Sequence, residues 1–309
     1  MSRRSVTAAL AISTAMLTAC TTVIDNLPTH QTCLEPGSIQ TRVLAMKAAD
    51  FEPRSDTSYA EMANLLVACL GAPDPQIRDD VAYAGLTHLL RGKLLTANEM
   101  RGLKQPLMRS LSGPDPDGYR RPFTALVLSE IIRADRVAPY LSDTERDDIL
   151  NAGLTYLSEL NDYRGFDDTE GWRHGTAHGA DLLMQITLNP AFTRADHLQI
   201  LGTIGLKMRV DSHAYIFGEG ERLTRPVLFI ARANTLTAED WSTWFEGLAD
   251  PAPLTSWGEA FSSEAALTRL HNLKYTLYPM LIQVQLAAQR QTDPHPLLTP
   301  LLEAVKKLP

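Results

Sequence analysis

Apolar residues return every three or four positions along most of the chain, and this spacing predicts a protein built almost entirely of α-helices. The segments 81–90 and 126–132 are clear examples, because each carries leucine, isoleucine or valine at helical intervals. No convincing pair of alternating apolar and polar segments joined by a tight turn is present, so no strand pair is expected. The pattern therefore favours the all-α class.

Capping residues mark several predicted helix starts. Ser58, Thr96 and Ser142 are each followed three residues later by a glutamate, which is the capping-box pattern. Turn residues interrupt the helical pattern at several places and divide the chain into roughly a dozen helices of ordinary length. These breaks fall at residues 71–74, 113–118, 163–171, 218–220 and 250–253.

Helices that follow one another through short linkers pack as antiparallel hairpins. A long series of such hairpins forms either an α-solenoid of the HEAT or armadillo type or a closed α/α ring. No repeat of fixed length is visible in the sequence, so the pattern leaves the choice between these two architectures open.

The first residues have the pattern of a lipoprotein signal peptide. Arg3 and Arg4 form a positive start, residues 6–16 form an apolar run too short to span a bilayer, and the next segment, LTAC, resembles a bacterial lipobox that ends at Cys20. We therefore expect residues 1–19 to be removed and Cys20 to become the lipidated first residue of the mature chain.

The residues that follow predict the location and the domain organisation. Thr21 stands where an inner-membrane retention aspartate would be, so the expected location is the periplasmic side of the cell envelope, at the outer membrane. Residues 20–38 contain proline, glycine and polar residues without periodicity, which is typical of a flexible tether. Residues 39–309 are predicted to form a single all-α domain.

Composition restricts the partners of this chain. Cys33 and Cys69 would lie in an oxidising compartment, where two thiols tend to be bridged, but two separate thiols are the open alternative. The formal net charge is −7 and no block of lysine and arginine occurs, so nucleic acid is not an expected partner. The expected partners are the membrane, through Cys20, and an unidentified small molecule, peptide or envelope protein.

The stretch GWRHGTAHGADLL, residues 171–183, is predicted to form an interior helix with one polar stripe. At roughly 100° per residue, His174, His178 and Asp181 fall on one side of this helix. Asp181 is the only charged residue between positions 175 and 193, whereas an exposed helix normally carries several charges. The glycines and alanines that flank the stripe suit close approach of neighbouring helices.

A buried aspartate beside two histidines needs partners, and two kinds are possible. In a functional interpretation, His174, His178 and Asp181 hold a divalent metal such as zinc, with Asp181 as a third ligand or as an outer carboxylate. In a structural interpretation, Asp181 pairs with an arginine and the histidines bond to backbone or water. Neither a His-Glu-x-x-His pattern nor a nearby cysteine is present, so a metal-free polar pocket is favoured.

The segment FGEGERL, residues 217–223, is the best complement to this polar stripe. Glu219, Glu221 and Arg222 open a helix there, and Arg222 is a natural partner for Asp181. We predict that the two segments face each other across an enclosed pocket. The alternative is that the two glutamates only favour the positive end of a helix dipole.

Two further candidates have simpler structural interpretations. His213 could add an imidazole to the pocket, although a lone histidine is more often a hydrogen-bonded bystander. Asp167 and Asp168 could lie at the rim, or they could be turn and N-cap residues.

Four blocks of the sequence together resemble an uncharacterised bacterial family, the domain of unknown function 2785. They lie in the family's order at residues 77–90, 120–132, 164–183 and 218–223. The resemblance implies an α-helical fold related to superhelical repeats, and it implies no activity. Its most specific block, Gly-Trp-x-His-x-x-x-His-Gly-Ala-Asp, falls on Gly171, Trp172, His174, His178, Gly179, Ala180 and Asp181.

The sequence contains no serine-hydrolase, P-loop or dinucleotide motif. Three functions fit the remaining observations. The first is an envelope enzyme of the hydrolase type, in which a metal-activated water or a histidine titrating near neutral pH would do the chemistry. The second is a binding module whose helical array captures a ligand, and the third is a structural lipoprotein. The catalytic residues of the enzyme would be His174, His178, Asp181, Glu219, Glu221 and Arg222.

Overall fold

The computed structural model of the chain describes Cys33, residues 39–290 and residues 294–309. Nearly all regular structure in this part is helical, which confirms the predicted all-α class. The predicted signal peptide, the lipidation site at Cys20 and the rest of the tether lie outside the described residues. Within the described part, every helix is too short or too polar to cross a membrane.

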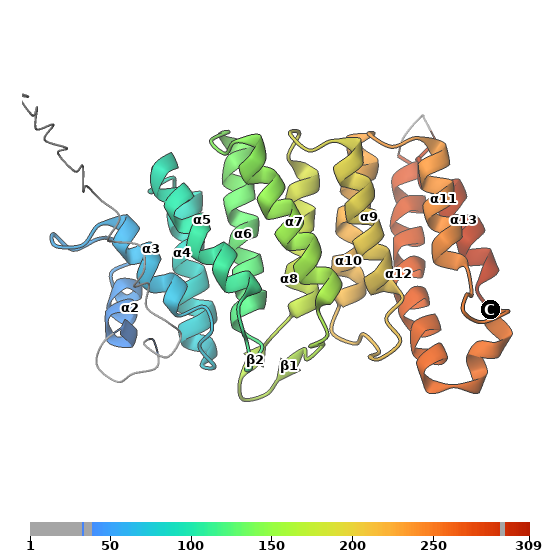
Figure 1. Cartoon of the computed structure of the whole chain (residues 1–309), viewed down its shortest axis with the longest axis horizontal. Helices are drawn as coiled ribbons and strands as arrows, with labels where there is room; N and C mark the ends of the chain where they lie inside the picture. The colour runs from blue at the N-terminus through green and yellow to red at the C-terminus, as the bar shows by residue number, and fades with distance from the viewer. Residues whose placement is uncertain (1–32, 34–38, 291–293) are drawn as a thin grey trace, which may run out of the picture.

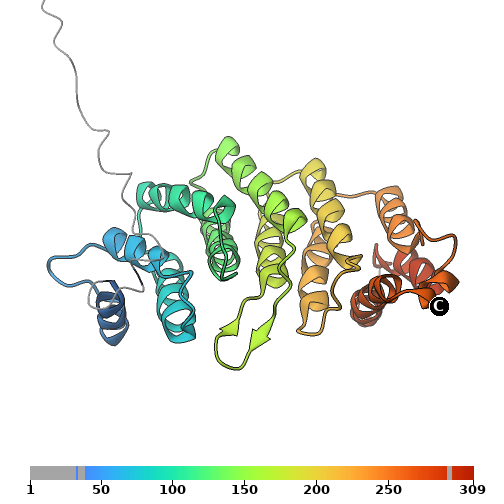
Figure 2. The same cartoon turned by 60° about the horizontal axis from the view of Figure 1, so that its bottom comes forward.

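The helices lie in two layers that run side by side along the molecule (Figure 1 and Figure 2). Each helix packs against the next one in its own layer, and successive helices of the chain alternate between the layers. The inner layer contains a short π-helical segment η1 (Gln76–Tyr83) that runs into α4 (Ala84–Arg91), then α6 (Arg120–Val137), α8 (Gly175–Leu188), α10 (Glu219–Ala233) and α12 (Glu264–Ala288). The outer layer contains α3 (Tyr59–Ala68), α5 (Ala97–Ser112), α7 (Asp143–Glu159), α9 (Arg194–Met208) and α11 (Ala238–Ala249).

Short helices cover the two ends of this row. At one end α2 (Ile39–Ala48) packs against η1 and α3. At the other end α13 (Leu298–Lys307) packs against α11 and α12, and η2 (Trp257–Ser262) packs against α12. The two ends lie far apart (Figure 1), and the row is arched with the outer layer on its convex side (Figure 2). The helices therefore form an open row and do not close into the α/α ring that was one predicted alternative.

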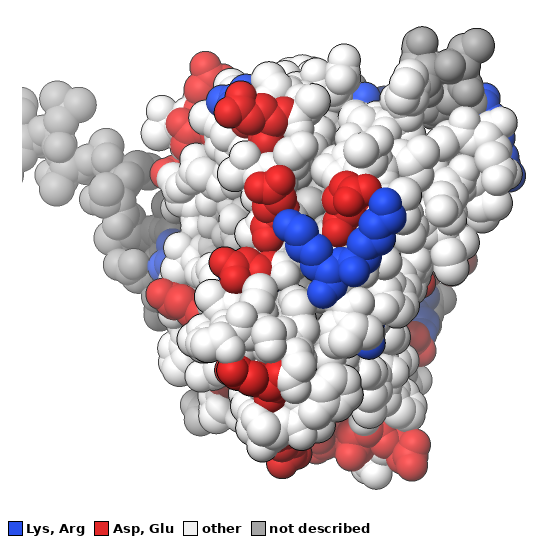
Figure 3. Space-filling view, turned by 90° about the vertical axis from the view of Figure 1, so that its right-hand side faces the viewer, with Lys and Arg blue, Asp and Glu red and all other residues white. Residues whose placement is uncertain are grey.

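The face at the C-terminal end of the row carries mixed charge. Figure 3 shows a small group of lysine and arginine side chains flanked by acidic ones, within a larger uncharged surface. This face therefore has no extended area of one sign.

The predicted capping boxes are present at the starts of α3, α5 and α7. The hydroxyl oxygens of Ser58, Thr96 and Ser142 each accept a hydrogen bond from the backbone N–H of the glutamate three residues later, whose side chain bonds back to the cap. A further box begins α11, where Thr237 pairs with Asp240. The glutamate pattern missed this box because the carboxylate there belongs to the shorter aspartate.

The break predicted at residues 163–171 contains a β-hairpin, so the expectation that no strand pair occurs was wrong. β1 (Phe166–Asp167) pairs antiparallel with β2 (Gly171–Trp172). Two residues per strand are too few for an alternating pattern to be recognised. Asp167 accepts hydrogen bonds from two backbone N–H groups of the turn, at 2.8 and 2.9 Å, which makes it a turn residue, and Asp168 is exposed.

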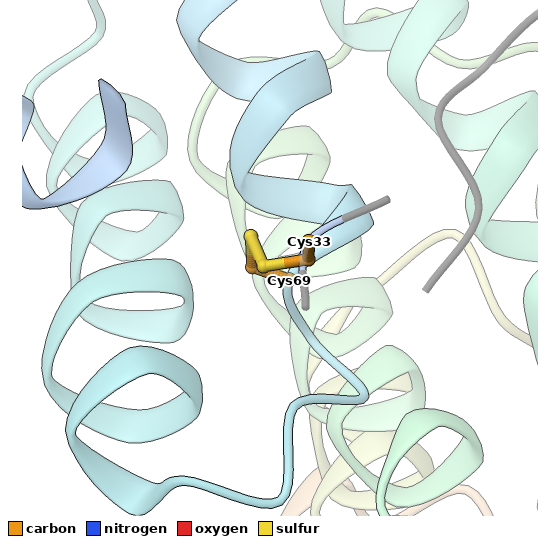
Figure 4. The surroundings of a disulfide bond; sticks show 2 residues. All are labelled: Cys33 and Cys69. Atoms are coloured by element: carbon orange, nitrogen blue, oxygen red, sulfur yellow. A yellow bond between two sulfur atoms is a disulfide. The ribbon is translucent and has the colours of Figure 1, made fainter. Parts of the chain in front are cut away.

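Cys33 and Cys69 form a disulfide bond (Figure 4). Their Cα atoms are 5.3 Å apart, and both residues are buried. Cys69 is the C-cap residue of α3, so the bond ties the chain before α2 to the end of α3. The predicted bridge is confirmed, and the alternative of two separate thiols was wrong.

Candidate functional site

α8 lies in the middle of the inner layer and packs against α6 on one side and α10 on the other (Figure 1). Residues 175–183 of this helix are all buried, as predicted for an interior helix. At Gly179 an added Cβ would lie 2.9 Å from a methyl carbon of Leu157 and 3.0 Å from the ring of Tyr156. The predicted close approach through small residues is therefore present between α8 and α7.

His174 lies just outside the helix, whereas the sequence placed it on the helical face. It is the N-cap residue of α8, in the left-handed region with φ 56° and ψ 32°, and its carbonyl accepts the N–H of His178 at 2.9 Å. Its ring stacks on Trp172 with centroids 3.9 Å apart. The two histidines still lie side by side, with ring centroids 5.4 Å apart.

Each of these imidazoles uses one ring nitrogen and leaves the other without a partner. His174 donates to the carbonyl of Phe217, which precedes α10, and His178 donates to the carbonyl of Pro122 in α6. Nε2 of His174 and Nδ1 of His178 are buried, and neither has a hydrogen-bond partner among the described residues. A neutral imidazole that donates through one nitrogen presents the other as an acceptor, so the site holds two unused acceptors.

The pKa values of both histidines are lowered. Burial is the largest cause for His174, followed by the charge of Arg222, and the pKa falls to about 4. Burial, the neighbouring His174 and Arg222 hold the pKa of His178 well below its usual value. Neither imidazole titrates near neutral pH, so the predicted role of a histidine as an acid–base group in that range is not supported.

Asp181 pairs with Arg222 of α10, which confirms the predicted contact between α8 and the segment 218–223. Arg225 lies 3.9 Å from the other carboxylate oxygen. The Asp181 side chain is 9% exposed, whereas those of Arg222 and Arg225 are 29% and 39% exposed. Burial raises the pKa of Asp181 by more than the attraction of Arg222 lowers it.

The two predicted glutamates bond to other groups. Glu219 is buried, and its carboxylate accepts the backbone N–H of Phe217 at 2.8 Å. Glu221 is 62% exposed and pairs with Arg225 one turn along α10, at 2.9 Å. Glu219 supports the site indirectly, because Phe217 also accepts the hydrogen bond of His174, and Glu221 is a surface residue.

The three residues predicted as metal ligands do not assemble into a metal site. No group of three or more His, Cys, Asp or Glu side chains in the described part of the chain could hold a metal ion. The Asp181 carboxylate is paired with Arg222, and the positive charge of that arginine also lies close to both imidazoles. The zinc site predicted from His174, His178 and Asp181 is therefore corrected to an ion pair beside two neutral histidines.

The predicted enclosed pocket also differs from what the structure contains. A cavity of about 90 Å³ touches the start of α8 on the side of α7, where Arg121, Tyr156 and Arg173 are among its lining residues. The cluster around Asp181 is instead partly open, because Arg222 and Arg225 reach the surface of the inner layer.

His213 lies outside this cluster. Its ring stacks on Tyr163 with centroids 5.5 Å apart. The ammonium of buried Lys207 donates to the Tyr163 hydroxyl at 3.2 Å and to the carbonyl of Leu160 at 2.6 Å, and burial lowers its pKa to about 8. This second group fastens the end of α9 to the end of α7.

Three residues that were not predicted belong to the cluster. The ring of Phe123 in α6 lies edge-on to His178 at 4.9 Å, and Tyr83 contacts Phe123 at 6.4 Å. These two aromatics have no signature in the sequence beyond an apolar pattern. Arg225 could have been found, because it follows Arg222 by three residues and therefore lies on the same side of α10.

The cluster offers a set of hydrogen-bonding groups whose charged members are paired. Asp181 pairs with Arg222, and Glu221 pairs with Arg225. The imidazoles add acceptors in the interior, and the guanidinium groups add donors near the surface. These groups suit recognition of a neutral polar ligand better than proton transfer at neutral pH.

One comparison with known proteins assigns this chain to a family. A search of curated proteins found no match, and a search of solved structures also found none. The sequence model of the family described as "Protein of unknown function (DUF2785)" matches residues 107–282, which is more than half of the chain and includes His174, Asp181 and Arg222. The resemblance drawn from the sequence blocks is confirmed, and the chain belongs to the family of proteins of unknown function DUF2785.

Proposed function

We propose that this chain is a lipid-anchored protein of the bacterial cell envelope that binds a glycan on the inner layer of a HEAT- or armadillo-like α-solenoid. The open row of helices that alternate between two layers supports the solenoid assignment. Solenoids bind ligands on their concave side, which is the side of the inner layer here. The observation that carries the proposal is the pair of unused imidazole nitrogens beside the Asp181–Arg222 pair.

The unused nitrogens require a hydrogen-bond donor. A buried polar group left without a partner costs about 1–3 kcal/mol, so a donor at His174 Nε2 and His178 Nδ1 would stabilise the protein. After burial, the charge of Arg222 is among the causes that lower the pKa of both imidazoles, and its partly exposed side chain can move to admit a ligand. Binding would therefore replace the missing hydrogen bonds.

A hydroxyl group fits this site because it both donates and accepts. It can donate to an imidazole nitrogen and accept from Arg222 or Arg225, and it carries no charge of its own. A sugar supplies several hydroxyl groups on one rigid ring. Proton transfer is less well supported, because the histidines stay neutral and the glutamates bond elsewhere.

Calorimetry with defined oligosaccharides tests the binding role. We would titrate chitotriose, maltotriose and cellotriose into the mature chain and into the variant His178→Phe, which keeps a flat aromatic ring, larger than imidazole, but has no ring nitrogen. At least one sugar should bind the wild type and bind the variant at least ten-fold more weakly, a loss of about 1.4 kcal/mol. Arg194→Gln, which breaks an exposed arginine–aspartate pair on the outer layer, is the control. Failure of all three sugars, or equal binding by both proteins, would contradict the proposal.

The envelope location rests on separate evidence. The lipobox-like segment ending at Cys20 and the disulfide between Cys33 and Cys69 support it, because disulfides persist in oxidising compartments. Cells that express Cys20→Ser should no longer incorporate labelled palmitate into the protein. Equal labelling of the wild type and this variant would show that Cys20 is not the anchor.

A further inference from the structure

A second buried carboxylate on the inner layer pairs with an exposed arginine. Glu130 of α6 is buried, and its carboxylate oxygens accept hydrogen bonds from Nε and Nη2 of Arg91 at 2.9 and 2.6 Å. The Arg91 side chain, at the end of α4, is 51% exposed. The group formed by His178, Asp181 and Arg222, which we call the His178 cluster, contains the same arrangement, because its carboxylate is buried and its guanidinium reaches the surface. The inner layer therefore carries two such pairs, one between α4 and α6 and one between α8 and α10.

Tyr83 is close to both ion pairs. Its ring contacts the ring of Phe123 with centroids 6.4 Å apart, and Phe123 contacts His178 at 4.9 Å, so a single ring separates Tyr83 from the His178 cluster. Burial is the largest cause that raises the pKa of Tyr83, and the charges of both Glu130 and Asp181 also raise it. The Tyr83 hydroxyl is therefore within electrostatic reach of both carboxylates.

The helices that carry these groups are neighbours in the inner layer. Tyr83 is the last residue of η1, which runs into α4. α4 packs against α6, and α6 packs against α8 (Figure 1). Because Tyr83 is only half-buried, its side chain keeps access to solvent. A polar surface thus continues from the His178 cluster across α6 to Arg91.

The ring between Tyr83 and His178 is firmly held. Phe123 is buried, and the guanidinium of buried Arg78 lies over its ring at 4.9 Å from the centroid. Arg78 is itself fixed, because it donates to the backbone carbonyls of Ala72 and Pro73 at 3.0 and 2.9 Å. The separation between Tyr83 and the His178 cluster is therefore set by the packed core.

We propose that Tyr83 and the Arg91–Glu130 pair form a second subsite, which binds the next sugar unit of a glycan held at the His178 cluster. This inference rests on the proposed glycan-binding role and adds that the ligand is an oligosaccharide lying across the inner-layer helices. A tyrosine offers an apolar ring and a hydroxyl that both donates and accepts, which suits the C–H groups and hydroxyls of a sugar. Arg91 has further N–H donors beyond the two that bond to Glu130, and these can donate to sugar hydroxyls.

Titrations with sugars of different length test this inference. Calorimetry would measure the binding of chitotriose, maltotriose and cellotriose, and NMR chemical-shift titration would measure the binding of the monosaccharides N-acetylglucosamine and glucose. The protein is the full mature chain carrying Cys20→Ser, so that lipid does not interfere. For the trisaccharide that binds, Tyr83→Ala should weaken binding at least ten-fold. It should change binding of the matching monosaccharide less than two-fold, because a single unit occupies the His178 cluster, whereas His178→Phe should weaken both.

Two further variants separate ligand binding from folding. Arg91→Lys keeps a positive charge beside Glu130 but loses the forked hydrogen bonds, so it should weaken trisaccharide binding at least three-fold and leave monosaccharide binding unchanged. This exposed substitution tests the subsite even if Tyr83→Ala does not fold. Tyr59→Ala removes a half-buried tyrosine from the outer-layer helix α3 and should leave the binding of both sugars unchanged.

The possible failures have different signatures. If Tyr83→Ala weakens the monosaccharide and the trisaccharide equally, Tyr83 only supports Phe123 and the second subsite is overturned. If Tyr83→Ala and Arg91→Lys leave trisaccharide binding unchanged, the second subsite is also overturned, while the binding role of the His178 cluster stands. If no sugar binds the wild type, the proposed function itself is contradicted, and the second subsite is contradicted with it.

Discussion

Asp135 of α6 and Asp181 of α8 are both buried and both pair with an arginine, but the rest of their surroundings differ. Asp135 accepts the backbone N–H groups of Tyr140 and Leu141, each at 2.8 Å, and the Asn189 amide at 2.9 Å, in addition to the Arg146 guanidinium at 2.7 Å. Asp181 has Arg222 and the more distant Arg225. One carboxylate is saturated with donors, and the other is not.

Because the two carboxyl groups differ in the number of donors around them, their pKa values are shifted in opposite directions. Burial is the largest single effect on both and raises the pKa. At Asp135 the hydrogen bonds from Arg146, the two backbone N–H groups and Asn189 together outweigh burial, so the pKa is lowered. At Asp181 the attraction of Arg222 is too small to do so, and the pKa is raised.

This difference separates a carboxylate that holds the fold together from one that has fewer partners and that, in the proposed function, is available to a ligand. Asp135 joins the end of α6 to α7 and to the residue that follows α8, and it has no capacity left for a further partner. Asp181 lies beside two buried imidazole nitrogens without partners and two partly exposed guanidinium groups. An incompletely bonded polar cluster in an otherwise well-packed core is typical of a binding site.

Removing the saturated carboxylate should have the largest effect on stability. Asp135→Ala leaves Arg146, Asn189 and two backbone N–H groups without their acceptor, so the free energy of unfolding should fall by about 3–5 kcal/mol in urea denaturation. Asp143→Ala is the matched control, because Asp143 also pairs with Arg146 but is 96% exposed. Its cost should be about 0.5 kcal/mol or less.

Removing the incompletely bonded carboxylate should cost less. Asp181→Ala deprives Arg222 of its partner, but that side chain is 29% exposed and can turn toward water. The free energy of unfolding should therefore fall by only about 1 kcal/mol in the same assay. A loss as large as that of Asp135→Ala would mean that the Asp181 pair is structural, and the contrast between the two regions would disappear.

The dependence of stability on pH should differ in sign between the two sites. The lowered pKa of Asp135 contributes stability that is present above the unfolded pKa of about 3.9 and is lost as the pH falls through the folded value. The raised pKa of Asp181 has the opposite effect, because the folded state then binds its proton more tightly. The contribution of Asp181 is therefore greatest below about 3.9 and is lost as the pH rises through the folded value.

Urea denaturation between pH 2.5 and pH 6 would measure this difference. The loss of unfolding free energy caused by Asp135→Asn should increase with pH up to about pH 4. The loss caused by Asp181→Asn should decrease as the pH rises above about pH 4. If the loss of unfolding free energy changed with pH in the same direction in both variants, the opposite pKa shifts of Asp135 and Asp181 would be contradicted.

Only a small effect on stability is expected at His178. His178→Phe removes a buried nitrogen that has no partner, but it also leaves the Pro122 carbonyl without its donor. These two effects oppose each other, so the free energy of unfolding should change by about 1 kcal/mol or less in thermal denaturation. A large loss would show that the ring nitrogens already have firm partners and would remove the main support for a ligand.

The sequence was sufficient for features that depend on neighbouring residues. The capping boxes at Ser58, Thr96 and Ser142 depend on a spacing of three, and the interior position of α8 depends on its lack of charges. The Asp181–Arg222 pair could also be predicted, because a buried aspartate needs a cationic partner and the segment 217–223 supplies one.

Features that depend on distant segments could not be predicted. His174 has a left-handed backbone and its ring contacts Trp172 and the backbone of Phe217, and the lowered pKa of His178 depends on its burial against α6. The partner of Glu219 could not be predicted for the same reason, because it is a backbone group that a helical wheel does not contain. Packing between layers therefore decides which polar residues remain available to a ligand.

A carbon-13 NMR titration of the aspartate carboxyl carbons would measure the difference between Asp135 and Asp181 directly. Asp135 and Asp181 would be assigned through their alanine variants and followed together as the pH is lowered. We expect the carboxyl group of Asp181 to titrate above the usual pKa of 3.8 and that of Asp135 to titrate below it. If Asp181 instead titrates at or below the pKa of Asp135, its carboxylate is as fully bonded as a structural one, and the claim that this cluster is an open binding site is contradicted.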